Sequence, residues 1–224
     1  MITRYLPLLA ASLRRKRLRT FFTLASIAVA FLLYGLADSM RHALQSGVDV
    51  AGADRLITMH KVSFTQLVPQ SYENRIRAID GVVDVTPQTW FGAWYQNERN
   101  QLPAFPVKPE AFLRMYPEYI VPEAERLAWL ADRTGILIGR GVTDMTGWKV
   151  GDTVPLRSSI WRRTDGSDAW EFTVSAIYDL PEGGDTRQIL LHQDYFDEAK
   201  SQAKGLVGWY LVKVDDVGRA QSIG

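Results

Sequence analysis

Residues 14–37, RRKRLRTFFTLASIAVAFLLYGLA, decide how this chain is organised. From Thr20 to Ala37 no side chain is charged, and the polar ones are two threonines, a serine and a tyrosine. A helix satisfies its own backbone groups and can satisfy hydroxyls locally, which lipid requires. At 1.5 Å per residue this run reaches roughly 27 Å, close to a hydrocarbon core of about 30 Å. The sequence therefore predicts a transmembrane helix over 20–37.

The charges around this run predict its direction. Arg14, Arg15, Lys16, Arg17 and Arg19 precede it, and no acidic residue occurs among residues 1–19. Positive charges beside a first span stay in the cytoplasm, so the chain after the span is expected outside it. Residues 20–224 carry 20 basic and 25 acidic residues, against 26 and 25 in the whole chain. An almost neutral chain with an acidic body gives no electrostatic case for nucleic acid.

A cleaved secretory signal is the competing interpretation, because Gly35-Leu36-Ala37 has the small-x-small form of a cleavage site. The helical pattern argues against cleavage, since Leu36, Met40 and Leu44 continue it at a spacing of four. We therefore expect one helix from Leu18 to Ser46, ended by Gly47, whose last turns (38–52 with the connection) form a stalk above the bilayer. Leu36, Met40 and Leu44 are expected to pack against a neighbouring stalk.

The segment before the span allows two interpretations. Ile2, Tyr5, Leu6, Leu9 and Leu13 share one helical face, which predicts a short helix in the cytoplasmic interface. An irregular basic tail held by charge to anionic lipid fits residues 1–19 equally well.

Residues 53–215 change period and alternate between strand and helix patterns, which predicts an extracytoplasmic α+β domain with a mixed sheet. The pattern allows either one body or two lobes that divide near residues 105–135. Asp165-Gly166 predicts a hairpin turn between strands 160–163 and 170–178. In the second of these strands, Trp170 and every second residue to Tyr178 are expected on one buried face. The other expected strands are 56–60, 63–68, 82–85, 88–95, 135–138, 153 onward, 189–191 and 206–214; the expected helices begin at 71, 109, 122, 142 and 195.

The sequence offers little chemistry. It has no cysteine, and its three histidines, at 42, 60 and 192, are scattered, so we expect no metal site. His192 is interpreted as a satisfied strand-end residue. Gly139-Arg140-Gly141 lacks the third glycine of a dinucleotide fingerprint and is interpreted as a turn. No nucleophile motif, Walker loop or carboxylate pair is present, so we expect neither a catalytic residue nor a cofactor.

Trp161 is the one tryptophan singled out as a candidate partner contact. It stands beside Arg162, Arg163 and the Asp165-Gly166 turn, where a hairpin tip would offer little core to a large side chain.

Three motifs in this order resemble a known family. The basic stretch LRRKRLRTFFTLASIAVAF enters the first span; Ile79-Asp80-Gly81-Val82-Val83-Asp84-Val85 follows a helix; and GILIG at 135–139 precedes GWKVGDTV at 147–154. Together they resemble permease subunits of MacB/FtsX-type ABC transporters, over residues 1 to about 215.

The resemblance implies a first transmembrane helix, a MacB-like periplasmic core domain and three further spans. Residues 216–224 would then be a truncated connection to a second span, and the chain a fragment of a longer permease. It also implies a homodimer or paired permeases in a bacterial inner membrane, driven by a separate or fused ATP-binding subunit. The implied mechanism is mechanotransmission, in which the stalk carries movement to the extracytoplasmic domain. The substrate stays open.

Two alternatives remain. A stand-alone, membrane-anchored binding or adaptor module fits the end of the chain at Gly224 literally. An anchored extracytoplasmic enzyme is the weakest alternative, because the sequence contains no nucleophile with a base, metal set or acid pair.

Overall fold

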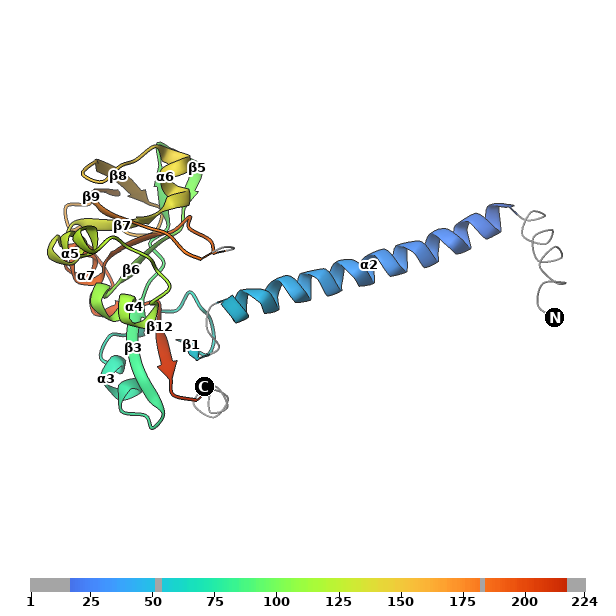
Figure 1. Cartoon of the computed structure of the whole chain (residues 1–224), viewed down its shortest axis with the longest axis horizontal. Helices are drawn as coiled ribbons and strands as arrows, with labels where there is room; N and C mark the ends of the chain where they lie inside the picture. The colour runs from blue at the N-terminus through green and yellow to red at the C-terminus, as the bar shows by residue number, and fades with distance from the viewer. Residues whose placement is uncertain (1–16, 51–53, 182–183, 217–224) are drawn as a thin grey trace. The chain divides into compact units, whose positions relative to one another are not determined.

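The structure is a computed structural model that describes residues 17–50, 54–181 and 184–216. The chain divides into two compact units, Met1–Gly52 and Ala53–Gly224 (Figure 1). The interfacial helix expected before Leu13 lies outside the described residues.

The described residues of the first unit form one long helix, α2 (Arg17–Val50). Its stretch from Leu18 to Ser39 is long and apolar enough to cross a membrane, two residues wider at each end than the predicted span. The helix is uninterrupted, as the sequence predicts, but the expected end at Gly47 is wrong because the helix continues to Val50. An isolated glycine costs a helix only about 1 kcal/mol, too little to stop its propagation.

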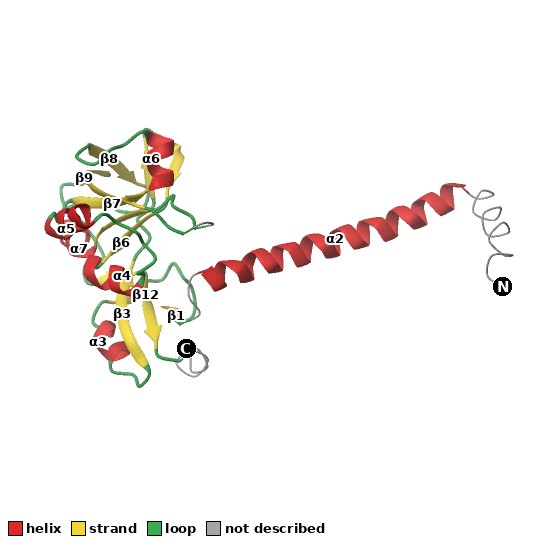
Figure 2. Ribbon diagram, viewed as in Figure 1, coloured by secondary structure: helices red, strands yellow, loops and turns green. Residues whose placement is uncertain are grey.

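The second unit is an α+β domain with a mixed sheet, which confirms the predicted class (Figure 2). Its helices are α3 (Tyr72–Arg77), α4 (Pro109–Met115), α5 (Glu123–Ala131), α6 (Arg140–Thr146) and α7 (Gln193–Ala199). Its strands are β1 (Arg55–Met59), β2 (Val68–Pro69), β3 (Val82–Gln88), β4 (Ala93–Tyr95), β5 (Asn97–Leu102), β6 (Ala104–Val107), β7 (Gly135–Gly139), β8 (Thr153–Ser158), β9 (Ala169–Tyr178), β10 (Ile189–His192), β11 (Leu206–Val207) and β12 (Trp209–Val214).

Ten strands form one sheet in the order β1-β12-β3-β6-β10-β7-β9-β8-β4-β5. The pairs β6–β10 and β7–β9 are parallel, and the other pairs are antiparallel. The segments 82–95 and 97–107 behave as one long bent hairpin: β3 pairs with β6 at one end, and β4 pairs with β5 at the other. Because β4 also pairs with β8, this hairpin contributes to both sides of the sheet and curls it around a core.

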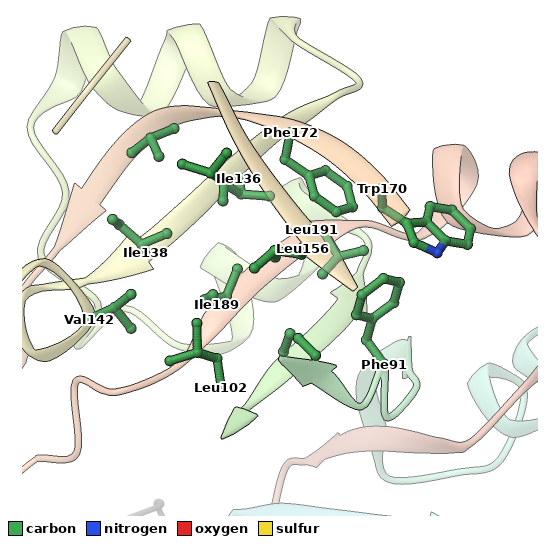
Figure 3. Close-up of a cluster of buried hydrophobic side chains, with 14 of the residues drawn as sticks. Phe91, Leu102, Ile136, Ile138, Val142, Leu156, Trp170, Phe172, Ile189 and Leu191 are labelled. Carbon is green, nitrogen blue, oxygen red and sulfur yellow. The ribbon is translucent and has the colours of Figure 1, made fainter. Parts of the chain in front are cut away.

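That core is the largest buried cluster of the domain. Side chains of Phe91, Ile136, Trp170, Phe172 and Leu191 point toward one another between the strands (Figure 3). The Phe91 ring meets Trp170, Phe172 and Phe196 edge to face, with ring centroids 5.3, 6.1 and 5.8 Å away. Such aromatic contacts add to the stabilisation from burying apolar area.

The predicted alternation of buried and exposed side chains along β9 is interrupted by a β-bulge. Ile136 pairs with Val174, but the next residue, Leu137, pairs with Ala176, so Ser175 is extra on β9. One extra residue moves all later side chains to the opposite face. Ala176 and Tyr178 therefore pack in a second cluster with Leu137, and not beside Trp170 and Phe172 as expected.

The sequence pattern allows two lobes that divide near residues 105–135, and Val107, at the narrowest point of the sheet, lies in that range. The pairing between neighbouring strands is shortest where β3 meets β6, since only one pair of residues, Gln88 and Val107, joins these two strands. On one side of this point lie β1, β12 and β3, which come from the two ends of the domain sequence. These strands have a buried cluster of their own, made mainly of valines and Tyr210. Backbone hydrogen bonds from Thr89 to Pro106 and from Phe91 to Ala104 continue the pairing past the narrow point.

Three further element boundaries differ from the predictions. Residues 63–67 form turns, and only Val68–Pro69 of the expected strand pairs, with β11. Helix α7 starts two residues earlier than expected and ends at Ala199. The Asp165-Gly166 turn is present, with Gly166 at φ 85°, but the first arm of the hairpin is β8 and not residues 160–163.

Trp161 does not lie on the surface, where the sequence pattern predicts it. Its side chain is 4% exposed, so the expected surface position and partner contact have no support. Ser158 Oγ accepts a hydrogen bond from the backbone N–H of Trp161 (2.8 Å), which turns the chain inward after β8. The indole Nε1–H donates to the Trp90 carbonyl (2.9 Å), and the ring meets Phe196 edge to face at 5.2 Å. Trp161 is therefore a core residue.

Replacing Trp161 with alanine is expected to lower the free energy of unfolding by about 3–5 kcal/mol, because it leaves a cavity in the main core. The matched control is Ile160→Ala, because the side chain of Ile160, the residue before Trp161, is 46% exposed. This substitution is expected to lower the free energy of unfolding by less than about 1 kcal/mol. Urea unfolding of the full chain in detergent, followed by far-UV circular dichroism, measures both. Equal losses in the two variants would show that Trp161 is not part of the core.

Candidate functional site

The surface of α2 is the first candidate functional feature. Its large apolar side chains, from Leu18 to Leu36, are between 49% and 75% exposed. None of the candidate span is buried within the described residues. At about 25 cal/mol per Å², such a surface strongly favours an apolar environment over water. The helix is therefore suited to lipid.

Two hydroxyl groups of α2 form hydrogen bonds within the helix. Thr23 Oγ1 donates to the Arg19 carbonyl (2.9 Å), and Ser26 Oγ donates to the Phe22 carbonyl (2.8 Å). Hydroxyls paired in this way do not oppose burial in lipid. This confirms local pairing for Thr23 and Ser26, two of the four hydroxyl groups of the predicted span.

The residues proposed for stalk packing and orientation are only partly described. Leu36 lies on α2 and is exposed, as a contact with another helix requires. The side chains of Met40 and Leu44 lie outside the described ones, although their backbone is helical. Arg14, Arg15 and Lys16 also lie outside the described residues, whereas Arg17 begins the helix and Arg19 is exposed on it.

The second candidate feature is the strand pair at the two ends of the domain. β1 follows α2 in the chain, and β12 is the last strand in the part of the chain that the structure describes. The two are antiparallel with Arg55 opposite Lys213, and the Val214 N–H donates to the Asp54 carbonyl (2.8 Å). The chain therefore enters and leaves the folded domain side by side.

Arg55 fixes β1 to the body of the domain. Its guanidinium forms a bidentate ion pair with the Glu118 carboxylate, including Nη2 to Oε2 at 3.0 Å. It also lies over the Tyr116 ring, 4.4 Å from the centroid. Burial raises the pKa of the Tyr116 hydroxyl to about 12, so this group stays neutral beneath the cation. The Arg55 side chain is 11% exposed and that of Glu118 26%, so water weakens this pair less than a surface pair.

A second ionic cluster joins β3 to the helices beside it. The Asp84 carboxylate accepts hydrogen bonds from Arg77 (2.9 Å), Arg114 (3.2 Å) and the Val85 N–H (2.9 Å). Burial opposes ionisation of Asp84, but these donors outweigh it and hold its pKa below the ordinary value. Asp84 therefore links α3 and α4 to the strand next to β12.

The Gly139-Arg140-Gly141 motif has a packing role. A Cβ on Gly139 would lie 1.9 Å from the Thr186 carbonyl, and one on Gly141 would lie 2.8 Å from Arg187 Cγ. The Gly141 N–H donates to Thr186 Oγ1 at 3.0 Å. The two glycines therefore admit the segment 186–188 against the end of β7, so the motif shapes the fold here.

No group of three or more His, Cys, Asp or Glu side chains that could hold a metal ion occurs among residues 17–50, 54–181 and 184–216. His192 is the strand-end residue that the sequence predicts: it ends β10, and its Nε2 lies 2.8 Å from the Trp129 carbonyl. Burial lowers the pKa of His192, so the neutral ring donates this hydrogen bond. The ring borders a hollow of about 360 Å³ whose charged side chains are of both signs, Lys108, Glu110, Arg133 and Asp194.

Comparison with known proteins shows what the domain resembles. No protein-family model matches the chain, and no curated protein matches its sequence. Solved structures do match. The periplasmic region of MacB from Actinobacillus actinomycetemcomitans is 10% identical; the match covers 79% of this chain and 83% of that one, with a TM-score of 0.53. The extracellular domain of the noncanonic ABC-type transporter YknZ from Gram-positive bacteria is 12% identical, over 76% and 87%, with a TM-score of 0.49.

The domain therefore has a MacB-like periplasmic fold, which confirms the fold that the sequence resemblance predicts. The sequence signals were the first span, the strand after Gly81 and the two glycine-containing segments. The Arg55–Glu118 pair and the Asp84 cluster were missed. Residues 63 and 30 positions apart meet in these contacts, and only the fold brings them together.

Removing the Arg55–Glu118 pair is expected to loosen β1. Arg55→Met and Glu118→Gln should each lower the free energy of unfolding by about 2 kcal/mol, because the remaining partner is half-buried without its counter-charge. The double variant should lose less than the sum, with a coupling of about 1–2 kcal/mol. Thermal unfolding of the full chain in detergent measures this cycle.

Arg133→Met is the matched control, since Arg133 pairs with Glu198 on the surface. It is expected to show no measurable loss. Additive effects of Arg55→Met and Glu118→Gln would show that the pair does not hold the strand.

Proposed function

We propose that this chain is a permease-type subunit of an ABC transporter, with α2 in a bacterial inner membrane and the domain of residues 53–215 outside the cytoplasm. ATP hydrolysis by a partner subunit moves this domain through the helix, to export or extract a substrate. The observation that carries the proposal is one uninterrupted helix, suited to lipid, placed directly before a domain with a MacB-like periplasmic fold.

The length of α2 supports mechanical transmission. Its 34 residues extend for roughly 51 Å, and the part from Met40 to Val50 continues for about 16 Å beyond the apolar span. A continuous helix carries a tilt or displacement along its axis, whereas a flexible linker dissipates it. Leu36, Met40 and Leu44 are the residues proposed to pack against a neighbouring stalk.

The partners follow from the same proposal. One span cannot enclose a path through lipid, so transport requires further spans, supplied by a longer chain or by an assembly. A homodimer or paired permeases with an ATP-binding subunit would provide them. The adjacent ends of the domain at Asp54 and Val214 suit insertion between two spans. The chain itself is proposed to have no enzymatic activity and to bind no nucleic acid.

The basic cluster is expected to set the orientation. Replacing Arg14, Arg15, Lys16, Arg17 and Arg19 with glutamine should leave much of the domain on the cytoplasmic side, because the charge bias that retains the N-terminus is lost. Protease accessibility of the domain in spheroplasts measures this, with intact cells as the reference. Replacing Arg75, Arg99, Arg157, Arg162 and Arg187 in the domain, a matched number of charges, should leave the orientation unchanged. The proposed topology would be contradicted if protease added to spheroplasts left the wild-type domain intact and digested it only after lysis.

The stiffness of the stalk is expected to couple ATP hydrolysis to movement. Ala43→Gly with Leu44→Gly should break the coupling, since each glycine disfavours the helix by up to about 1 kcal/mol. The measurement is ATPase activity of the membrane complex copurified with its ATP-binding subunit, together with protease sensitivity of the domain with and without ATP. The ATP-dependent change in sensitivity should disappear in the glycine variant and persist in Leu44→Ala, which keeps the helix.

If the chain purifies from membranes without any ATP-binding subunit, the result would instead favour the stand-alone anchored module. An unchanged ATP response in the glycine variant would contradict mechanotransmission while leaving the subunit assignment intact.

A further inference from the structure

The two edges of the ten-stranded sheet are built differently. At one edge, β5 (NERNQL) carries the exposed charges of Glu98 and Arg99, which discourage pairing with another chain. At the other edge, β1 (RLITM) has a single charged residue, Arg55, which is turned inward to Glu118. The apolar side chains of Ile57 and Met59 on β1 are 59% and 45% exposed. The β1 edge therefore lacks the protection of the β5 edge.

The backbone of β1 offers hydrogen bonds at this edge. The Asp54 carbonyl accepts from the Val214 N–H, so the groups of alternate residues from Asp54 onward point to β12. The N–H and C=O groups of Arg55, Ile57 and Met59 consequently point away from β12. No strand of the described residues pairs with β1 on that side.

An apolar strip continues from this edge across the neighbouring strands. Met59 pairs with Trp209, whose ring centroid lies 6.3 Å from that of Phe105. Phe105 in turn lies 5.2 Å from Trp90, which is partly exposed. A strand added at β1 would extend the sheet and this strip together.

We propose that β1 pairs with β1 of a second copy of this chain, antiparallel and with Ile57 opposite Ile57. In this register Arg55 of each copy faces Met59 of the other, and all the outward backbone groups meet in pairs that exchange two hydrogen bonds each. The two isoleucines cover each other.

The charges at the ends of β1 favour this occupant. The antiparallel register places Asp54, before the strand, opposite His60, which is followed by Lys61. The Asp54 carboxylate lies 3.6 Å from Lys213 of its own chain and is 33% exposed, so it can also face the cation of Lys61 of the other copy, and the two-fold symmetry repeats this contact. Arg55 faces an apolar residue, so no like charges are opposed. A strand with one acidic and one basic end is complementary to itself only when antiparallel.

The pairing has two-fold symmetry, the commonest symmetry of homodimers. It rests on the proposed function in one respect, since anchoring by α2 holds both copies on the same side of the membrane. The pairing itself requires no transport and no ATP-binding subunit.

Cysteine crosslinking tests the pairing directly, because the chain has no cysteine of its own. In an antiparallel pair, residues that exchange hydrogen bonds have Cα atoms about 5.5 Å apart, within the range of a disulfide. Ile57→Cys in the full chain, oxidised in its native membrane, should run mostly as a covalent dimer on a non-reducing gel. Arg99→Cys, exposed on the opposite edge, should stay monomeric.

A second variant tests the interface without a crosslink. Ile57→Lys places two cations opposite each other and should convert the detergent-purified dimer to monomer, measured by size exclusion with light scattering. Val62→Lys is the control, since Val62 is 74% exposed and lies outside β1. It should remain dimeric, and circular dichroism verifies that both variants are folded.

Three outcomes would overturn the proposal. Equal crosslinking at Ile57→Cys and Arg99→Cys would indicate non-specific association. An uncrosslinked Ile57→Cys that reacts with a membrane-impermeant maleimide would show an open edge. An uncrosslinked thiol that the maleimide cannot reach would show that lipid or another protein covers β1. Release of the chain from membranes by alkaline carbonate would separately contradict anchoring, so the two failures are distinguishable.

Discussion

The structure depends first on backbone hydrogen bonding where water is absent. Across Leu18–Ser39 the apolar side chains of α2 are uncovered, so only lipid or another apolar surface can surround them. A helix meets that condition because every interior N–H and C=O is paired within the segment, and Thr23 and Ser26 pair their hydroxyls in the same way. The same requirement keeps the helix continuous from Arg17 to Val50.

The domain is held by contacts of a different kind. Its interior depends on interlocking aromatic rings around Phe91, and its first strand depends on one ion pair that is largely removed from solvent, Arg55–Glu118. Core packing gives the domain its shape, whereas the ion pair decides how firmly the chain entering from α2 is joined to that shape. The fold thus places Asp54 beside Val214 and leaves β1 at one edge of the sheet.

Patterns of local period were sufficient to predict α2, α4 and the buried strand β7, whereas the MacB-like fold was expected only from the resemblance of three motifs to a known family. These patterns did not predict where a strand departs from strict alternation. Ser175 adds one residue to β9 and reverses the direction of Ala176 and Tyr178, and nothing in the alternating sequence marks the extra residue. Trp161 looked exposed because charged residues surround it, but Ser158 turns the backbone inward and Phe196, far along the chain, receives the ring. The Arg55–Glu118 contact likewise joins distant segments. Local sequence determines which element forms, and long-range packing determines what that element touches.

The adjacency of Asp54 and Val214 also determines how the domain responds to load. Hydrogen bonds between antiparallel strands lie across the strands, so a pull that separates the two neighbouring ends breaks them one after another, like opening a zipper. A push that carries both ends in the same direction leaves every bond intact. The domain is consequently robust toward shared motion of its two ends and weak toward opposed motion, and the Asp54–Lys213 ion pair (3.6 Å), which joins the two strands at these ends, is the first side-chain contact to resist the latter.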